Sequence, residues 1–222
     1  PIFSHNLGLV YLDNAATTQS PRAVIDEQKK WQEQHYAPVH RSLYRLGAQA
    51  SEAYESTRHL ISKFIQADSD QSIIFTANGT HALNLAAAIE QERLQAGDEI
   101  ILSVAEHHSN ILPWQRVARH TGAKIVWLEL TEQRKFSLEH LSQLLSNRTK
   151  VVSLAHVSNV LGYVAPIKEI VILAHAVGAR VVVDGTQAAG RMPVNLHELQ
   201  ADYYAASGHK LYGPGGTGWL YA

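Results

Sequence analysis

The 222-residue sequence contains no cysteine at all. This absence excludes a disulfide framework, a zinc or iron-sulfur site held by cysteine, and a cysteine nucleophile within these residues. An excess of charge of one sign is also missing, because 20 acidic residues balance 19 basic ones and leave a formal net charge of -1. The sequence therefore generates no long-range field for nucleic acid or an anionic membrane, and neither is expected as a partner.

Long hydrophobic runs are missing as well. No stretch approaches the roughly 18 consecutive apolar residues that a membrane-spanning helix needs. The first residues also lack the basic-then-apolar pattern of a signal peptide, so we expect a cytoplasmic location. What the sequence does contain is 45% hydrophobic residues. This is enough for a sizeable core and excludes disorder as a description of the whole chain.

Short runs rich in isoleucine and valine alternate with helical segments after Gln71. Seven of them are expected to form strands, at residues 72–76, 99–103, 124–128, 150–156, 180–184, 203–207 and 218–222. Most of these runs are almost continuously apolar, which is typical of strands covered on both faces. Helical crossovers between them predict an α/β fold, with a mainly parallel sheet flanked by helices. No repeat or linker interrupts the sequence, so we expect an N-terminal extension over 1–20 and one large domain over 21–222.

Two helices are predicted ahead of the sheet. The first has Ser20 as its cap and Pro21 at the first helical position. The second begins at Ala50, because apolar residues recur from there to Ile65 at every third or fourth position. This spacing predicts a long amphipathic helix with one buried stripe.

Polar residues follow five of the predicted strands. Ligands bind beyond the carboxyl ends of the strands in open parallel sheets, so these segments are expected to face one crevice. They are residues 77–80, 105–108, 157–159, 184–187 and 207–210.

Each candidate residue has an ordinary alternative when it is considered alone. Gly79 and Thr80 at a helix start offer free backbone amides and a hydroxyl to a phosphate, although most such sequences only cap a helix. Asp184 is costly to bury without a cationic partner, but it could equally be an exposed carboxylate at a strand end. Lys210 beside a glycine-rich loop could be a solvated lysine in a turn.

Two further motifs carry less weight. His107 and His108 are adjacent, so on an extended segment they point to opposite sides, and no metal site is expected. Residues 213–218 match the GxGxxG pattern, but they precede an apolar run instead of following a strand and opening a helix. We therefore interpret them as a turn into a strand, and a nicotinamide-dependent dehydrogenase has only this misplaced match in its favour.

Together the candidates describe one ligand. Thr80, Ser207 and His209 offer groups that bind an anion, and Asp184 offers a partner for a ring nitrogen. His107 offers an aromatic face, and Lys210 offers an amine. Pyridoxal 5'-phosphate has all the matching features. Its aldehyde forms a Schiff base with a lysine, and an aspartate beside the pyridine nitrogen keeps that nitrogen protonated, so the ring can withdraw electrons from a substrate α-carbon.

Six ordered motifs extend this hypothesis over nearly the whole chain. They are YLDNAATT at 11–18, HRS at 40–42, AEHHSNILPW at 105–114, HVSNVLG at 156–162, VDGTQAAG at 183–190 and SGHKLYGPGG at 207–216. Together they resemble the class V aminotransferase family of fold type I pyridoxal phosphate enzymes. Within that family they are most similar to the cysteine desulfurases that supply sulfur for iron-sulfur clusters.

The resemblance implies a role for each candidate. Lys210 would carry the cofactor, and His107 would stack on its ring and move protons, so these two are the expected catalytic residues. Asp184 would pair with the pyridine nitrogen.

The remaining expected cofactor contacts also come from the resemblance. Gln187 would bond the phenolic oxygen of the ring, and Asn159 would lie near that oxygen and the substrate carboxylate. Thr80, Ser207 and His209 would hold the phosphate.

The same resemblance implies conversion of L-cysteine to L-alanine plus an enzyme-bound persulfide, a homodimer, and a sulfur-acceptor protein as partner. Family members continue into a smaller C-terminal domain that bears the persulfide-forming cysteine and an arginine for the substrate carboxylate. We expect that domain to be absent from this chain, which then holds the cofactor half of the site. Another class V activity (aminotransferase, selenocysteine lyase or epimerase) and a non-catalytic fragment without cofactor are the alternatives.

Overall fold

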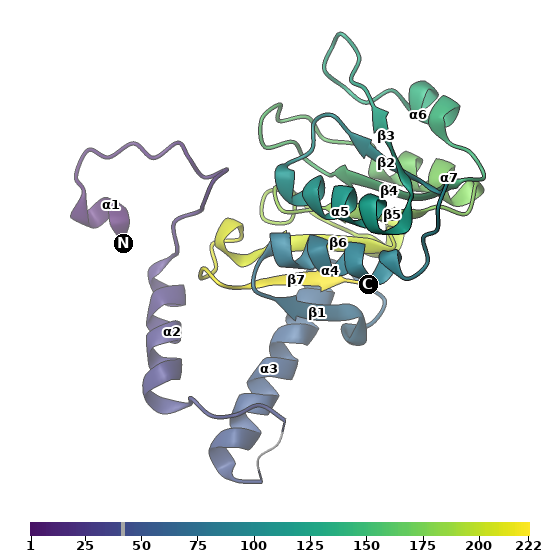
Figure 1. The fold of residues 1–222 in the computed structure, drawn as a ribbon. Coiled ribbons are helices and arrows are strands. Elements are labelled where there is room, and N and C mark those ends of the chain that lie inside the picture. Colours follow the sequence, from purple (N-terminus) through teal and green to yellow (C-terminus); the bar gives the residue numbers. More distant parts are fainter. Residues whose placement is uncertain (41–42) are drawn as a thin grey trace.

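The computed structural model describes residues 1–40 and 43–222. The HRS motif is therefore described only at His40, because Arg41 and Ser42 lie outside the described residues. A seven-stranded sheet forms the centre of the molecule, with the order β1-β7-β6-β5-β4-β2-β3 (Figure 1). Its strands are β1 (Ile73–Thr76), β2 (Glu99–Ser103), β3 (Lys124–Leu128), β4 (Thr149–Ala155), β5 (Arg180–Asp184), β6 (Tyr203–Ser207) and β7 (Gly218–Tyr221).

The strand directions confirm the predicted mainly parallel sheet. Strands β2 to β6 pair in parallel, whereas β7 runs antiparallel to both β6 and β1. All seven strands lie within one residue of their predicted bounds. The register aligns Ala155, Asp184 and Ala205 across β4, β5 and β6. The segments that follow these strands therefore leave the sheet at the same edge.

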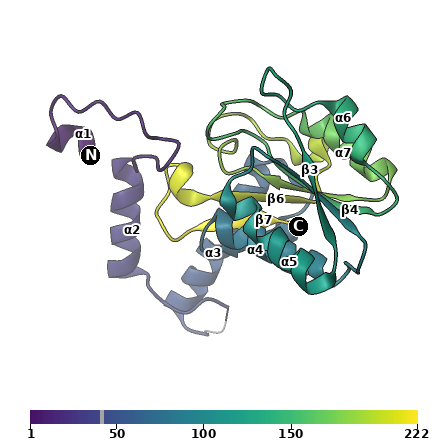
Figure 2. The same ribbon diagram turned by 45° about the horizontal axis from the view of Figure 1, so that its top comes forward.

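Helices cover both faces of the sheet and produce three layers (Figure 2). One face is covered by α4 (Gly79–Gln91) and α5 (Leu112–Thr121), and the other by α6 (Leu138–Leu144), α7 (Ile167–Ala176) and α8 (Leu196–Leu199). Successive residues of a strand point to opposite faces. In β2, Ile100 and Leu102 pack in the cluster under α4, while Ile101 packs in the cluster under α7. Burial on both faces explains why the strand sequences are continuously apolar.

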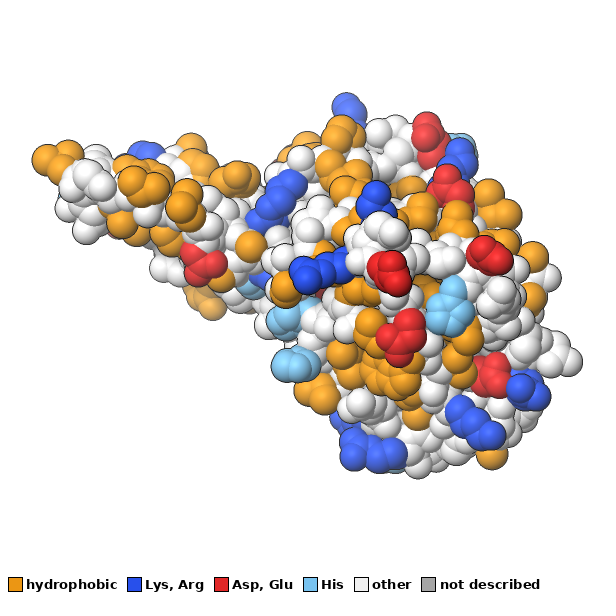
Figure 3. Space-filling view, turned by 90° about the horizontal axis from the view of Figure 1, so that it is seen from above, with side chains coloured by type: hydrophobic (Ala, Val, Ile, Leu, Met, Phe, Trp, Pro, Cys, Tyr) orange, Lys and Arg blue, Asp and Glu red, His pale blue; other side chains and the backbone are white. Residues whose placement is uncertain are grey.

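The N-terminal residues lie outside these three layers. Helices α1 (Ile2–His5) and α2 (Arg22–Gln34) contain no buried residue. They form an arm whose surface carries many hydrophobic side chains (Figures 1 and 3). The predicted cap of α2 is wrong by one position, because Pro21 occupies the cap and Ser20 makes no capping hydrogen bond. The Ser20 hydroxyl instead donates to the Gly213 carbonyl at 3.3 Å.

The long helix predicted from Ala50 forms as α3 (Arg45–Phe64), beginning five residues earlier. Its apolar stripe is only partly buried, contrary to the prediction. Ala50 is buried, as is Ile65 at the cap that follows the helix, but Leu60 and Phe64 are 64% and 58% exposed. The spacing of apolar residues correctly predicted a helix. Most of its stripe stays exposed because α3 reaches the sheet only near its C-terminal end (Figure 1). Three short 3-10 helices complete the elements: η1 (Asp70–Ser72), η2 (His108–Asn110) and η3 (Gly208–Lys210).

Within residues 1–40 and 43–222, none of the helices combines the length and apolar character required to cross a bilayer.

Candidate active site

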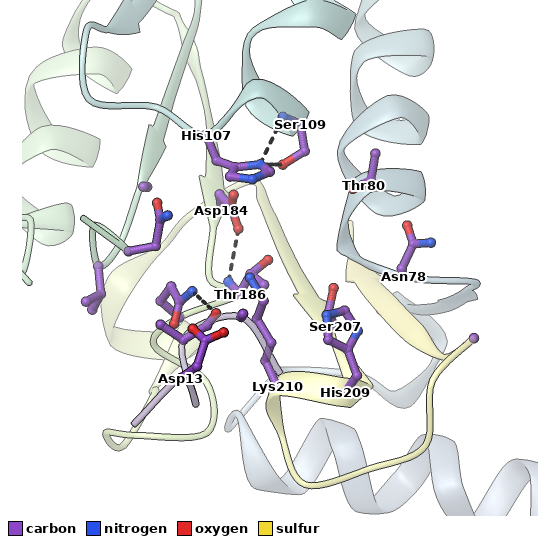
Figure 4. Close-up of a pocket in the computed structure, with 17 residues that line it drawn as sticks. Asp13, Asn78, Thr80, His107, Ser109, Asp184, Thr186, Ser207, His209 and Lys210 are labelled. Atoms are coloured by element: carbon purple, nitrogen blue, oxygen red, sulfur yellow. Dashed lines mark hydrogen bonds between the residues drawn. The ribbon is translucent and has the colours of Figure 1, made fainter. Parts of the chain in front are cut away.

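A cavity of about 580 Å³ opens at the edge of the sheet where the parallel strands end (Figure 4). All eight predicted site residues line it: Thr80, His107, Asn159, Asp184, Gln187, Ser207, His209 and Lys210. Each of the five predicted polar segments contributes at least one of them, so the expectation of a single crevice is confirmed. The volume lies within the range of about 300–1,000 Å³ that is typical of small-molecule sites.

Asp184 ends β5 and points into the cavity (Figure 4). It is only 6% exposed, and its Oδ1 accepts a hydrogen bond from the Thr186 N–H at 3.0 Å. In the part of the chain that the structure describes, no Lys or Arg forms an ion pair with it. A buried carboxylate without a cationic partner is costly. The position therefore favours a ligand that brings an N–H group or a positive charge.

Lys210 reaches the same cavity from η3, directly after β6. Burial lowers the pKa of its amine, the charge of Asp184 opposes this effect, and Arg191 adds to it. Among the described residues the amine and the Asp184 carboxylate form no ion pair with each other, and both line the same cavity. An amine with a lowered pKa is neutral more often and can act as a nucleophile toward a carbonyl.

The start of α4 forms a third wall. The Asn78 side chain caps the helix by accepting from the His81 N–H at 2.8 Å, and the Ser207 hydroxyl accepts from the Gly79 N–H at 2.7 Å. The prediction that both Gly79 and Thr80 offer free amides is therefore wrong for Gly79. Within the described residues, neither the N–H nor the hydroxyl of Thr80 has a partner, and both remain for an anion at this helix start.

Glycine is required at position 79 by a close approach of three segments. A Cβ atom there would lie 2.8 Å from the hydroxyls of both Ser207 and Thr186. His209 lies next to this wall and lines the cavity. Burial, with a smaller contribution from Lys210, lowers the pKa of the His209 imidazole.

His107 precedes η2 and its ring lies above Asp184 in the view of Figure 4. Its Nδ1 accepts from the Ser109 N–H at 3.2 Å and lies 2.7 Å from the Ser109 hydroxyl. Because a backbone N–H can only donate, Nδ1 is the acceptor nitrogen, and the proton of the neutral ring belongs to Nε2. The His108 ring is tilted by 49° with its centroid 6.1 Å away, and it does not line the cavity. No cluster of three metal-ligating side chains occurs in the described ranges.

The turn formed by residues 13–16 closes the cavity, and the sequence analysis did not assign it a site role. Asp13, Ala15 and Ala16 line the cavity. The Gln187 amide donates to the Ala15 carbonyl at 2.8 Å, so one of its two hydrogens is engaged and the other remains for a ligand. The signal that could have marked this turn is the run of short side chains in DNAATT, which suits neither a buried strand nor an amphipathic helix.

A buried pair of polar side chains, on the strands that flank the end of β5, lies next to the cavity without lining it. The His156 Nδ1 lies 2.9 Å from the Tyr204 hydroxyl, and both side chains are buried. Burial lowers the pKa of His156 to about 4. Gly185 lies against the Tyr204 ring, and a Cβ atom at this position would overlap it at 1.8 Å. The residue after Asp184 therefore has to be glycine for the strand to leave the sheet here.

Comparison with known proteins identifies the class. A family model described as aminotransferase class-V matches residues 10–222. The chain therefore belongs to the class-V aminotransferase family.

Several individual proteins of known sequence or structure are similar to this chain. The chain is 48% identical over 214 residues to a probable cysteine desulfurase from Synechocystis sp., which covers 96% of this chain and 51% of that protein. The crystal structure of the cysteine desulfurase CsdA from Escherichia coli matches with a TM-score of 0.88 at 40% identity, covering 96% and 53% of the two chains. A structure of SspA in complex with cysteine matches with a TM-score of 0.89 at 26% identity, covering 96% and 58%. The chain spans about half the length of the curated relatives it matches.

Proposed function

We propose that this chain is the cofactor-binding part of a pyridoxal 5'-phosphate-dependent cysteine desulfurase. The observation that carries the proposal is the pairing of Lys210 and Asp184 in one cavity without an ion pair between them. The names of the relatives support the reaction, and the structure of SspA with cysteine supports the substrate.

The polar groups of the cavity suit pyridoxal phosphate. The Asp184 carboxylate would face the pyridine nitrogen, and Lys210 would bind the aldehyde carbon. When bound, the cofactor supplies a ring that withdraws electrons from the α-carbon of an amino acid. The free N–H and hydroxyl of Thr80 suit the phosphate, with Ser207 and His209 beside them.

The other residues of the chain would orient the reactants. His107 would cover one ring face, and its Nε2 would hold or release a proton there. The remaining amide hydrogen of Gln187 would be available to the phenolic oxygen. Asn159 would lie near that oxygen and the substrate carboxylate. Lys210, with its lowered pKa, would also hold or release a proton at Nζ beside the substrate.

The overall reaction needs a thiol that these residues do not contain. The C–S bond of L-cysteine breaks and an S–S bond forms between the substrate sulfur and an enzyme thiol. The hydrogens of L-cysteine and the hydrogen of the enzyme thiol are all found again in L-alanine and the persulfide. The atoms therefore balance without an external oxidant. We infer that the thiol lies in a part of the protein outside this chain, and that the persulfide then passes to a sulfur-acceptor protein for iron-sulfur cluster assembly.

A homodimer is part of the same proposal. The number of large apolar side chains exposed on the arm and on α3 supports it, because a partner surface could bury them. They include Leu7, Val10, Leu12, Leu60 and Phe64. A cytoplasmic location stays a prediction from the sequence.

Cofactor binding is tested first. The purified chain mixed with pyridoxal phosphate should develop a visible absorption band, and borohydride should fix the cofactor covalently to a peptide that contains Lys210. Lys210→Arg, which retains the positive charge, should lose both signals, and Lys135→Ala at an exposed site should retain them. Attachment to another lysine, or unchanged labelling of Lys210→Arg, would contradict the cofactor assignment.

The reaction is tested with the complete protein that carries this chain. L-cysteine should yield L-alanine in an amount that matches the persulfide formed. Cofactor binding without alanine formation, together with transamination or cleavage of another amino acid, would assign a sister activity of the family. Sedimentation of the same protein at several concentrations tests the dimer, and a monomer at micromolar concentration would contradict it.

A further inference from the structure

The residue before His107 carries a buried carboxylate that the proposed function does not use. Glu106 directly precedes His107, and its carboxylate accepts three hydrogen bonds. Ser103 donates to Oε1 at 2.7 Å, the Ala155 N–H donates to Oε1 at 3.0 Å, and the Asn110 amide donates to Oε2 at 2.7 Å. No cation forms an ion pair with it among the described residues.

The direction of these hydrogen bonds is fixed by groups that can only donate. Trp114 Nε1 donates to Asn110 Oδ1 at 3.2 Å, and the Ser153 hydroxyl donates to the same oxygen at 2.7 Å. The Asn110 amide nitrogen must therefore face Glu106. The Ala155 N–H is also an obligatory donor. Both oxygens of Glu106 consequently have to accept, which a carboxylate does and a carboxamide cannot.

Glu106 joins two walls of the cavity. The pairing of β2 with β4 ends at Leu102 and Ser153, before β4 reaches Ala155. The Ala155 N–H donates to the Glu106 carboxylate instead of to a β2 carbonyl. Ala155 begins the segment that carries Asn159 to the cavity. On the other wall, the Asn110 N–H donates to the His107 carbonyl at 2.8 Å. The loop from Glu106 to Asn110 is thus closed through both its backbone and its side chains.

We propose that Glu106 is a positioning residue that holds the His107 ring and the segment from Ala155 to Asn159 in a fixed relation across the cavity. Packing alone does not require a charge here, because well-packed apolar residues often replace buried charges without loss of stability. Burial opposes the charge and raises the pKa of Glu106 to about 7, while its three hydrogen bonds lower it. The three hydrogen bonds to Ser103, Ala155 and Asn110 are therefore the reason for an ionisable group at this buried position.

The first test uses the chain without cofactor. Glu106→Gln should shift the NMR signals of the His107 ring, because a donor amide then faces the Asn110 amide and the loop rearranges. Glu90→Gln is the matched control. Glu90 is also buried and accepts from the Tyr203 hydroxyl, but none of its partners (Tyr203, Arg93 and Arg180) lines the cavity, whereas Ala155, a partner of Glu106, does. It should lower stability while leaving the His107 signals in place.

The second test uses pyridoxal phosphate as a probe, and only this test rests on the proposed function. Glu106→Gln should weaken binding about tenfold. It should also shift the absorption band and its pH titration, and Glu90→Gln should change neither. If the unaltered chain binds no cofactor, the proposed function fails while the His107 measurement still tests Glu106.

Two outcomes would overturn the proposal. One is a Glu106→Gln chain that loses stability but keeps the His107 signals of the parent, and the other is a Glu90→Gln chain that shifts them equally. If Glu106→Gln does not fold, Ser103→Ala removes only one of the three donors. It should then still shift the His107 NMR signals, and unshifted signals would count against the proposal.

Discussion

The three-layer body and the N-terminal arm of this chain both contain large apolar side chains but have opposite surroundings. In the body, apolar residues of the strands are buried on both faces, and the buried polar side chains that the structure describes are hydrogen-bonded. In the arm and on α3, apolar residues at regular spacing face solvent. Sequence spacing therefore determines the local conformation in both regions, whereas burial depends on whether a second surface is present to cover the apolar face.

One part of the arm does not fit this contrast. The Thr18 N–H and hydroxyl both donate to the His209 carbonyl at 2.8 Å, and Arg191 donates to the Asn14 carbonyl at 2.6 Å. The turn from Asp13 to Thr18 is therefore attached to the loop that carries Lys210. Helices α1 and α2, before and after this turn, have no buried residue, whereas the turn between them is bonded to the residues around the cavity.

The contrast between body and arm predicts very different costs for the same substitution. Leu102→Ala, in the buried middle of β2, should lower the free energy of unfolding by about 2–5 kcal/mol. Leu12→Ala, at a residue that is 89% exposed, should change it by less than about 0.5 kcal/mol. Urea unfolding of the two variants measures both values. Equal costs would show that the arm is covered in solution.

Buried His156 makes the free energy of unfolding of the body depend on pH. Its pKa is lowered from 6.5 to about 4 in the folded chain. As the pH falls below 6.5, the unfolded state therefore takes up a proton that the folded state does not, and stability is lost down to about pH 4. The loss is up to about 3 kcal/mol. Glu106, whose pKa is raised to about 7, has the opposite slope over nearly the same range.

The comparison with His156→Gln isolates this effect, since glutamine can still bond the Tyr204 hydroxyl but does not titrate. Urea midpoints measured from pH 7 to pH 4 should converge for the two chains as the pH falls, and the difference between the curves removes the Glu106 contribution. Parallel curves would mean that His156 becomes protonated without cost.

The attachment of the turn predicts an intermediate effect. Thr18→Val removes a buried hydroxyl that also accepts from the Tyr212 N–H at 2.8 Å, and it should lower the free energy of unfolding by about 1–2 kcal/mol. Proteolysis of the arm should become faster as well. The neighbouring Thr17→Val removes only an exposed contact of 3.3 Å and is the control, with an expected change below about 0.5 kcal/mol. Equal effects of the two variants would contradict an attachment through Thr18.

The smallest effect is expected on the exposed stripe of α3. Phe64→Ser should change the free energy of unfolding of the isolated chain by less than about 0.5 kcal/mol, because the ring is largely exposed in the folded state. In the complete protein, the same substitution should weaken self-association if the stripe is part of the dimer interface. Sedimentation at several concentrations distinguishes these cases, and unchanged association would place the dimer contact elsewhere.

Strands and helices were predictable wherever one residue pattern dominates. The seven strands are apolar runs bounded by turns, and their positions followed within one residue. The burial of α3 was not predictable, because a periodic stripe does not specify its partner. The division of the chain after residue 20 stays a prediction.

The site was predictable as a set of residues but not as a set of contacts. Strand direction places Asp184 and Lys210 at one edge, so their convergence followed from topology. The hydrogen bond from Gly79 to Ser207 joins residues 128 positions apart and leaves no local signal in the sequence. The role of Glu106 was hidden for a related reason, since its partners lie on β2, η2 and β4.

The contact between Gly185 and Tyr204 also limits how this protein can evolve. Any side chain at position 185 would need a smaller residue at 204, yet a smaller residue there would remove the hydroxyl that His156 bonds. Accepted substitutions at these three positions should therefore occur in combination, and an intermediate with only one of them should be selected against even though none of the three has to touch a substrate.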